Sequence, residues 1–257
     1  KQLVMDYFRS KNPLSEVQKT DSIITRLSEI AQKGFSPSSL SLYLKDPLDF
    51  YHQRVLGIRE RQTLEVTINN MDKGNLVHEV LETLYLPYQN KVLKTKDFMD
   101  MRKKLGALME NKYQSIYHGN KKRTGRNQII FEVLKKSIID FLKIEEALVS
   151  EGNEIKILAL EKPFEHIIKI PELDFPIKLI GVVDRMDEFN GALRIIDYKT
   201  GAIQPKQLRL SDWNILREDP DFTYLFQILL YSYVHAETIS NYRASYAGII
   251  SFRNLPE

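Results

Sequence analysis

Apolar residues in the first half of the chain recur at the three- and four-residue spacing of amphipathic helices. Ser36 directly before Pro37 is the pattern of a helix N-cap followed by proline at the first helical position. The apolar stripe that begins at Leu40 continues past Pro47 and ends at Gly57. The spacing predicts helical segments over residues 23–30, 36–57, 72–88, 97–117 and 127–150.

The pattern changes from helical to extended after residue 153. Three runs are rich in β-branched residues and bounded by Gly, Pro or Asn, as strands are; they cover residues 155–170, 177–188 and 192–198. A polar connection over 201–221, an apolar helix over 222–236 and a final strand over 244–252 follow. This order predicts an α/β protein with one mixed sheet flanked by helices, preceded by a mainly helical N-terminal half.

The first 34 residues have mixed polarity, and we expect them to form a helical lead-in or linker. We expect one domain over residues 35–257, with a helical part up to residue 150 and an α/β core from residue 151. Because the chain opens with Lys1 and shows no signal-peptide pattern, we expect it to be a piece of a longer polypeptide.

The sharpest local signal is the pair Asn190-Gly191 between two strand-like runs. This pair favours a two-residue type I′ turn, which fixes how the two strands pair. With this turn, Phe189 lies opposite Ala192, and the numbers of paired residues add up to 381. Asp184 and Asp197 then lie directly opposite each other.

Two opposed carboxylates, with Cβ atoms ~4.5–5.5 Å apart, repel each other unless a hard cation lies between them. Lys199 is two residues after Asp197 and therefore lies on the same face of its strand. Its ammonium would lie beside the cation, where it could orient or help deprotonate an attacking water. Two carboxylates and a lysine around Mg²⁺ suit the hydrolysis of a phosphodiester. The alternative is an exposed hairpin in which each aspartate pairs with a neighbouring Arg or Lys.

His78 lies on the helix predicted over residues 72–88, and neutral imidazole suits a third metal ligand. The alternative is a structural histidine on a mostly apolar helix. His78-Glu79 also begins the zinc-peptidase pattern H-E-x-x-H, but the fifth position is Glu82, so the two-histidine zinc face is missing. Glu82 is kept as a further candidate site residue.

Gln227 and Tyr231 lie four residues apart on one face of the apolar helix over residues 222–236. Buried glutamine needs hydrogen-bond partners, such as a catalytic lysine, a strand edge or a phosphate. Alternatively, Gln227 caps a buried backbone group while Tyr231 simply packs. Glu161, before Pro163, is a candidate ligand or general base, or else pairs with a lysine.

Composition excludes several classes of function. The chain has no cysteine, which excludes disulfides, thiolate zinc or iron–sulfur sites and a cysteine nucleophile. This is compatible with a reducing compartment, and we expect a cytoplasmic protein. No window approaches the ~18 uncharged apolar residues of a membrane span, so we expect no membrane partner.

Positive charge is concentrated in residues 91–126, where eleven Lys or Arg stand against three acidic residues, although the whole chain has a net charge of only +3. Such a block suits a phosphate-rich partner, or alternatively is a solvated helical face and loop. We expect its loop to contact substrate through Lys121, Lys122, Arg123 and Arg126.

Taken in order, these motifs resemble the PD-(D/E)XK nuclease superfamily, and within it the RecB-like and AddB-like nuclease domains. The resemblance spans residues 35–252 and implies a restriction-endonuclease-like α/β core. Its motifs are Ser36-Pro37-Ser38-Ser39-Leu40, Gly74-x-x-x-His78, Gly181-x-x-Asp184-Arg185-x-Asp187, Asp197-Tyr198-Lys199-Thr200-Gly201 and Gln227-x-x-x-Tyr231.

The resemblance implies that His78, Asp184 and Asp197 bind Mg²⁺ or Mn²⁺, together with the backbone carbonyl of Tyr198. It implies that Lys199 positions the attacking water.

The resemblance further implies that the helix of Gln227 and Tyr231 supports the lysine and contacts the substrate. Arg185, beside the first metal-binding aspartate, is also expected at the substrate. Many AddB-like domains hold an iron–sulfur cluster through a cysteine just before the proline of the opening helix and three more cysteines near the C-terminus. Asp46 occupies that first position here, so we expect no such cluster.

The sequence thus predicts a metal-dependent deoxyribonuclease, an exonuclease in helicase-linked DNA repair or recombination. Its expected partners are DNA and a helicase-like domain or subunit. The rival from another class is a non-catalytic DNA-binding or scaffolding module that retains the nuclease fold. The presence of Asp184, Asp197 and Lys199 favours catalysis.

Overall fold

The computed structural model describes residues 17–58, 68–117 and 124–256. Contacts between residues divide the chain into two compact units. The first consists of Lys1–Glu60, Glu165–Ile180 and Asp212–Thr223, and the second of Arg61–Phe164, Gly181–Ser211 and Tyr224–Glu257. Every helix within these described ranges is too short or too polar to span a lipid bilayer.

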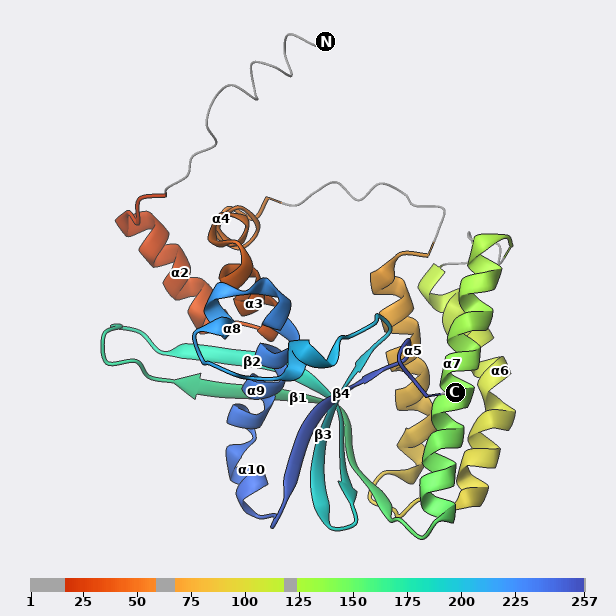
Figure 1. Ribbon diagram of the computed structural model, residues 1–257. Coiled ribbons are helices and arrows are strands. Elements are labelled where there is room, and N and C mark those ends of the chain that lie inside the picture. The colour runs from red at the N-terminus through yellow and green to blue at the C-terminus, as the bar shows by residue number, and fades with distance from the viewer. Residues whose placement is uncertain (1–16, 59–67, 118–123, 257) are drawn as a thin grey trace. The chain divides into compact units, whose positions relative to one another are not determined.

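One four-stranded sheet has the order β1-β2-β3-β4 (Figure 1). Its strands are β1 (Ile155–Ile168), β2 (Ile177–Phe189), β3 (Ala192–Lys199) and β4 (Ser245–Ser251). β2 pairs antiparallel with β3, whereas β3 pairs parallel with β4. These pairings confirm the mixed sheet predicted from the sequence. The two-residue turn between β2 and β3 requires antiparallel strands, and the helical crossover between β3 and β4 allows parallel ones.

The β2–β3 hairpin has the predicted register. Both residues of Asn190-Gly191 adopt positive φ, of 50° and 80°, as a type I′ turn requires. From this turn the pairing runs without a shift to Arg185, which lies opposite Ile196. Continued by one residue, the same register places Asp184 opposite Asp197.

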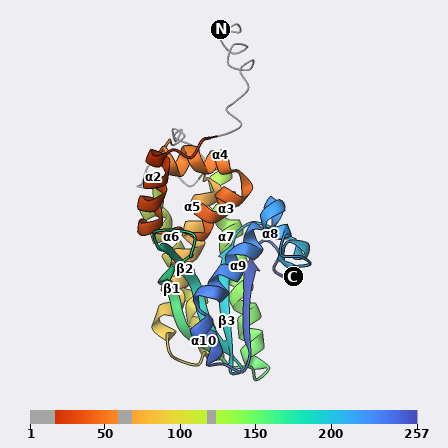
Figure 2. The same ribbon diagram turned by 90° about the vertical axis from the view of Figure 1, so that its left-hand side faces the viewer.

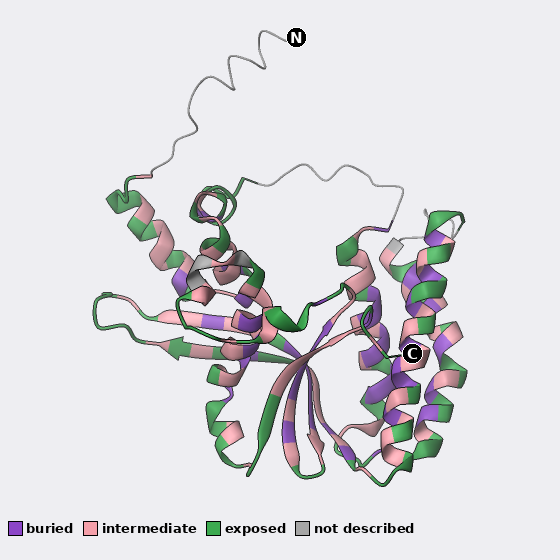
Figure 3. Ribbon diagram, in the orientation of Figure 1, coloured by how far each residue is buried: buried purple, intermediate pink, exposed green. Residues whose placement is uncertain are grey.

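Three long helices cover one face of the sheet in the second unit: α5 (Asn70–Tyr85), α6 (Thr95–Tyr117) and α7 (Arg126–Ser150). They run side by side, and their buried residues lie where they pack on one another and on the strands (Figure 3). The main hydrophobic core lies here and includes Leu76, Leu105, Ile138, Ile155 and Tyr198. The apolar stripes that predicted these helices are thus the faces that they bury.

Helices α9 (Thr223–Val234) and α10 (Ala236–Ser240) lie on the other face of the sheet (Figure 2). Phe164 of β1 packs edge-on against the ring of Tyr231, with centroids 6.0 Å apart. The connection before α9 is more ordered than the sequence predicts. It contains the 3-10 turns Pro205–Leu208 and Pro220–Phe222 and the short helix α8 (Ile215–Glu218). These elements are too short to show an apolar period.

The first unit contains α2 (Asp21–Lys33), α3 (Pro37–Lys45), α4 (Pro47–Phe50) and the π-helical turn Tyr51–Val55. The Ser36 hydroxyl accepts a hydrogen bond from the N–H of Ser39 at 3.2 Å, so the predicted N-cap is confirmed. The predicted continuous stripe breaks at Asp46. Its carboxylate accepts hydrogen bonds from the N–H groups of Leu48 and Asp49 and thereby starts a new helix.

A buried ion cluster ties β2 to α5 and α7. The guanidinium of Arg185 is fully buried, 2.9 Å from Glu145 of α7 and 2.5 Å from Asp187 of β2. Tyr85 of α5 donates a hydrogen bond to Glu145 at 2.5 Å, and Arg194 of β3 donates two to Asp187. The expectation that Arg185 contacts substrate is therefore wrong, because two carboxylates neutralise its charge inside the protein.

Replacing Arg185 with methionine should destabilise the fold, because it leaves the buried carboxylates of Glu145 and Asp187 without their central partner. Loss of one partner of a buried ion pair costs about 3–5 kcal/mol, and urea denaturation should show a loss of this size. Lys136→Ala, which removes an exposed ion pair with Asp140 at 2.6 Å, is the control and should cost less than about 1 kcal/mol. Equal stability of the two variants would contradict the role of the cluster.

Candidate active site

Helix α5 holds His78 beside the strands. Asn69 starts the helix by accepting a hydrogen bond from the N–H of Asp72 at 2.8 Å. The apolar side of the helix is buried in the core through Leu76, Val77, Val80, Leu81 and Leu84. Because that side is fixed, the half-buried imidazole of His78 is held at a defined place next to the sheet.

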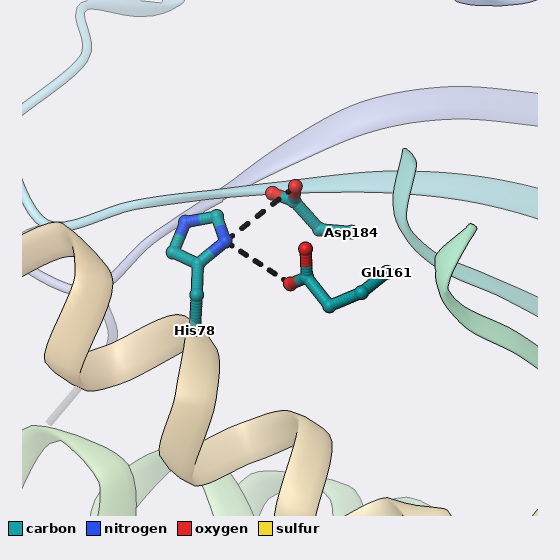
Figure 4. Close-up of side chains that lie close together, drawn as sticks. All are labelled: His78, Glu161 and Asp184. Carbon is teal, nitrogen blue, oxygen red and sulfur yellow. Dashed lines mark hydrogen bonds and ion pairs between the residues drawn. The ribbon is translucent and has the colours of Figure 1, made fainter. Parts of the chain in front are cut away.

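His78 faces oxygen atoms from three different strands. Its Nδ1 lies 3.3 Å from Oε1 of Glu161 in β1 and 3.5 Å from Oδ1 of Asp184 in β2 (Figure 4). Its Nε2 lies 3.1 Å from the backbone carbonyl oxygen of Tyr198 in β3. The side chains of His78, Glu161 and Asp184 thus form a group that could hold a metal ion.

Asp197 lies next to this group and is more deeply buried than Asp184, with 1% against 7% of its surface exposed. The Nζ of Lys199 lies 2.7 Å from its Oδ2, on the strand face that the sequence predicts. Gln227 of α9 donates a hydrogen bond to Oδ1 of Asp197 at 2.9 Å and another to the hydroxyl of Tyr231 at 2.7 Å. Gln227 therefore holds the aspartate, whereas the resemblance implies that its helix supports the lysine.

Glu161 has an unusual backbone conformation for a residue inside a strand. Its φ is 42°, in the left-handed region that residues other than glycine rarely adopt. Such strain costs about 1–3 kcal/mol and is concentrated at functional sites. Here it accompanies a carboxylate that points at His78 (Figure 4). Among the residues that the structure describes, Glu161 thus pairs with a histidine and with no lysine, unlike the alternative interpretation.

The donor set fits a divalent metal. Burial raises the pKa of Asp184 to about 7; the charge of His78 opposes this rise, and that of Asp197 adds to it. Burial also raises the pKa of Asp197, although Lys199 opposes it. A divalent cation among these groups would offset the penalty of burying negative charge. Carboxylates, a backbone carbonyl and one imidazole are ligands that suit Mg²⁺ or Mn²⁺.

The protonation of His78 is coupled to the same group. Burial lowers the pKa of His78, but its hydrogen bond with Glu161 and the charges of Asp184 and Glu161 outweigh burial and raise the pKa above 6.5. Both ring nitrogens face oxygen atoms, which favours the protonated ring. Because a ligating histidine must be neutral, metal and protons compete for this side chain.

A surface hollow of about 470 Å³ gives access to His78. Glu82, the further candidate from the sequence, lines this hollow one turn after His78 but is not part of the possible metal-holding group. Asn70, Gly74 and Asn75 of α5 also line it, although the residue types alone indicate no separate role for them. The signal that could have found two of them is the four-residue spacing from His78 along one helix face.

The structure describes the basic segment only in part. Three of its cations lie outside the described residues: Lys121, Lys122 and Arg123. Arg126 is exposed at the start of α7. Arg102 of α6 forms an ion pair with Glu146 at 2.6 Å, so part of the positive charge is already neutralised within the protein.

The metal-free protein should lose stability as the pH rises, and a divalent cation should reverse this loss. Because folding raises the pKa of Asp184 from 3.8 to about 7, the folded state binds more protons between these pH values. This contribution to stability is therefore lost as the pH increases through that window. Melting temperatures in EDTA should fall more steeply for wild type than for Asp184→Asn, and Mn²⁺ should stabilise wild type more at about pH 7.5 than at about pH 5. Parallel pH profiles of wild type and variant would contradict the assignment.

Known proteins similar to this chain include two nuclease subunits. The chain is 27% identical over 177 residues to an uncharacterized protein of Rickettsia conorii (strain ATCC VR-613 / Malish 7), a match that covers 67% of this chain and 20% of that protein. It is 28% identical over 200 residues to an ATP-dependent helicase/deoxyribonuclease subunit from Alkaliphilus oremlandii (strain OhILAs), covering 73% of this chain and 16% of the relative. It is 30% identical over 179 residues to the protein of the same name from Alkaliphilus metalliredigens (strain QYMF), a match that covers 63% of this chain and 15% of that relative.

The match thus spans no more than a fifth of the length of these relatives. A family model covers far more of the chain itself: that of the PD-(D/E)XK nuclease superfamily matches residues 34–255. With the mixed sheet and its flanking helices, this match shows that the chain belongs to the PD-(D/E)XK nuclease superfamily.

Proposed function

We propose that this chain is a divalent-metal-dependent deoxyribonuclease that hydrolyses DNA phosphodiester bonds. The main support is one observation: in a member of this superfamily, His78, Glu161 and Lys199 line one open hollow. The buried carboxylates of Asp184 and Asp197 lie directly behind them, 3.5 Å from His78 and 2.7 Å from Lys199. In the cluster around Arg185, by contrast, Arg185, Asp187 and Glu145 are all buried.

In this proposal, His78, Asp184, Asp197 and the backbone carbonyl of Tyr198 hold Mg²⁺ or Mn²⁺, and Glu161 serves as a further ligand or as a base. The bound cation supplies Lewis-acid stabilisation of the negative charge on the phosphate. The chain's own groups orient the reactants around it.

Lys199 positions the attacking water. Its ammonium offers three donors, and its ion pair with Asp197 at 2.7 Å keeps it on the metal-facing side of β3. The ring of Tyr224, 6.0 Å from Nζ, limits its movement on another side. Gln227 and Tyr231 fix the orientation of Asp197 from α9, and this helix also contacts the substrate.

We further propose exonuclease action in helicase-linked DNA repair or recombination. Two of the relatives are named as subunits of an ATP-dependent helicase/deoxyribonuclease, and the match covers only 16% and 15% of their lengths. A helicase-like domain or subunit would therefore work together with this nuclease domain.

Mutation of the hairpin should abolish cleavage without unfolding the protein. Asp197→Asn removes a metal ligand's charge and Lys199→Ala removes the water-positioning ammonium, so each should lower the cleavage rate by at least about 100-fold. The measurement is Mg²⁺- or Mn²⁺-dependent cleavage of end-labelled single- and double-stranded DNA, with EDTA as the blank. Lys206→Ala replaces an exposed lysine beyond the hairpin and should leave the rate unchanged.

The product ladder from this assay shows whether the strand is cut from an end or internally. Cleavage that survives both hairpin substitutions would contradict the proposed site. Wild type that binds DNA but never cuts it would instead favour a non-catalytic DNA-binding or scaffolding module.

The basic loop should contribute to DNA binding through charge alone. Neutralising Lys121, Lys122 and Arg123 should weaken binding and flatten its salt dependence, since each phosphate contact contributes about 0.7–0.9 to the slope of log K against log salt concentration. Fluorescence anisotropy at several salt concentrations measures this slope. An unchanged slope would exclude the loop from the DNA interface.

A further inference from the structure

Gly74 lies inside α5, one turn before His78, where the protein's own packing does not require a glycine. Its φ is outside the positive range that favours glycine. A Cβ atom added there would have no described atom within 4 Å, apart from its chain neighbours and the backbone of its own helix. Because glycine destabilises a helix interior relative to alanine, α5 would be more stable with alanine at this position.

The free space beside Gly74 belongs to the hollow that His78, Tyr198 and Lys199 also line. Glycine is the residue that allows another molecule to approach the backbone closely. The lack of a side chain at position 74 therefore serves a molecule that enters the hollow, and not the packing of the folded chain.

Charge along α5 determines on which side of His78 a polyanion can lie. After His78, the hollow is lined by the carboxylate of Glu82, which repels phosphate. Before His78, it is lined by Gly74 and by the amide side chains of Asn70 and Asn75, which are able to donate hydrogen bonds to phosphate oxygens.

We propose that Gly74 keeps the uncharged end of the hollow open, so that the sugar–phosphate backbone of a DNA strand lies against α5 and reaches the His78 group. This inference rests on the proposed deoxyribonuclease function. Helical side chains lean toward the N-terminus of their helix. A side chain at position 74 would therefore cover the floor of the hollow between His78 and Asn70.

Substitution of Gly74 should have opposite effects on stability and on activity. Gly74→Ala should raise the melting temperature by about 2–4 °C. Gly74→Leu should lower kcat/KM for single-stranded DNA at least about tenfold through KM, because steric overlap weakens binding. Binding of Mn²⁺ should stay unchanged in both. A purely structural glycine would instead lose stability and activity together.

Gly106, inside α6, offers the matched control. A Cβ atom added there would meet only the flexible end of Lys135, at 3.7 Å, among the described residues outside its own helix. Gly106→Ala should therefore gain stability as Gly74→Ala does, yet keep the cleavage and DNA affinity of wild type. Should Gly74→Leu fail to fold, Gly74→Ala gives the same comparison with a smaller loss of affinity, roughly threefold.

Binding of a fluorescent oligonucleotide in Ca²⁺ separates this inference from the proposed function. Weaker binding by the Gly74 variants, together with a wild type that binds but does not cut, supports the inference and contradicts the nuclease function. Wild-type kcat/KM and affinity in the Gly74 variants overturn the inference alone. Loss of Mn²⁺ binding in those variants also overturns it, because the metal group has then been disturbed. A wild type that neither binds nor cuts DNA overturns both.

Discussion

Two carboxylates are buried opposite each other in the β2–β3 hairpin, an arrangement that is unfavourable unless positive charge and hydrogen-bond donors are brought to it. Asp184 and Asp197 lose hydration and repel each other, and the pKa of Asp184 rises to about 7 as a result. The neighbouring elements each supply compensation: α5 brings His78, α9 brings the amide of Gln227, and β3 brings Lys199. The elements around the hairpin together hold a charge pattern that is ready for a divalent cation.

The other face of the same hairpin also carries buried carboxylates, but there the positive charge comes from the protein's own arginines. Because side chains alternate along a strand, Arg185 and Asp187 point away from the face of Asp184. There the carboxylates of Glu145 and Asp187 are neutralised by Arg185 and by the partly buried Arg194. One face is therefore neutralised by the protein's own charged side chains, whereas on the opposite face Lys199 lines the hollow together with His78.

The parts of the molecule differ in how far their sequence determines them. The pair Asn190-Gly191 restricts two φ angles, and local geometry alone then gives the register of the hairpin. The neighbours of His78 come from segments 83 and 120 residues away, so only a motif pointed to it. Strand alternation places the side chains of Arg185 and Asp184 on opposite faces of β2. Because the two residues are neighbours in one motif, the motif alone wrongly indicates that both lie at the substrate. The positive φ of Glu161 follows from tertiary packing and leaves no pattern in the sequence.

Because the two faces of the β2–β3 hairpin have different partners, insertions and deletions are tolerated only at certain positions in the hairpin. Removing or adding one residue within β2 after Arg185 would move every side chain before that point, Asp184 and Arg185 included, to the other face. Arg185 would then enter the hollow, and Asp184 would be carried into the closed interior beside α7. Lengthening the turn at Asn190-Gly191 leaves both strands in place. Insertions in this part of the chain are therefore expected at the tip of the hairpin, while the strands themselves vary by substitution alone.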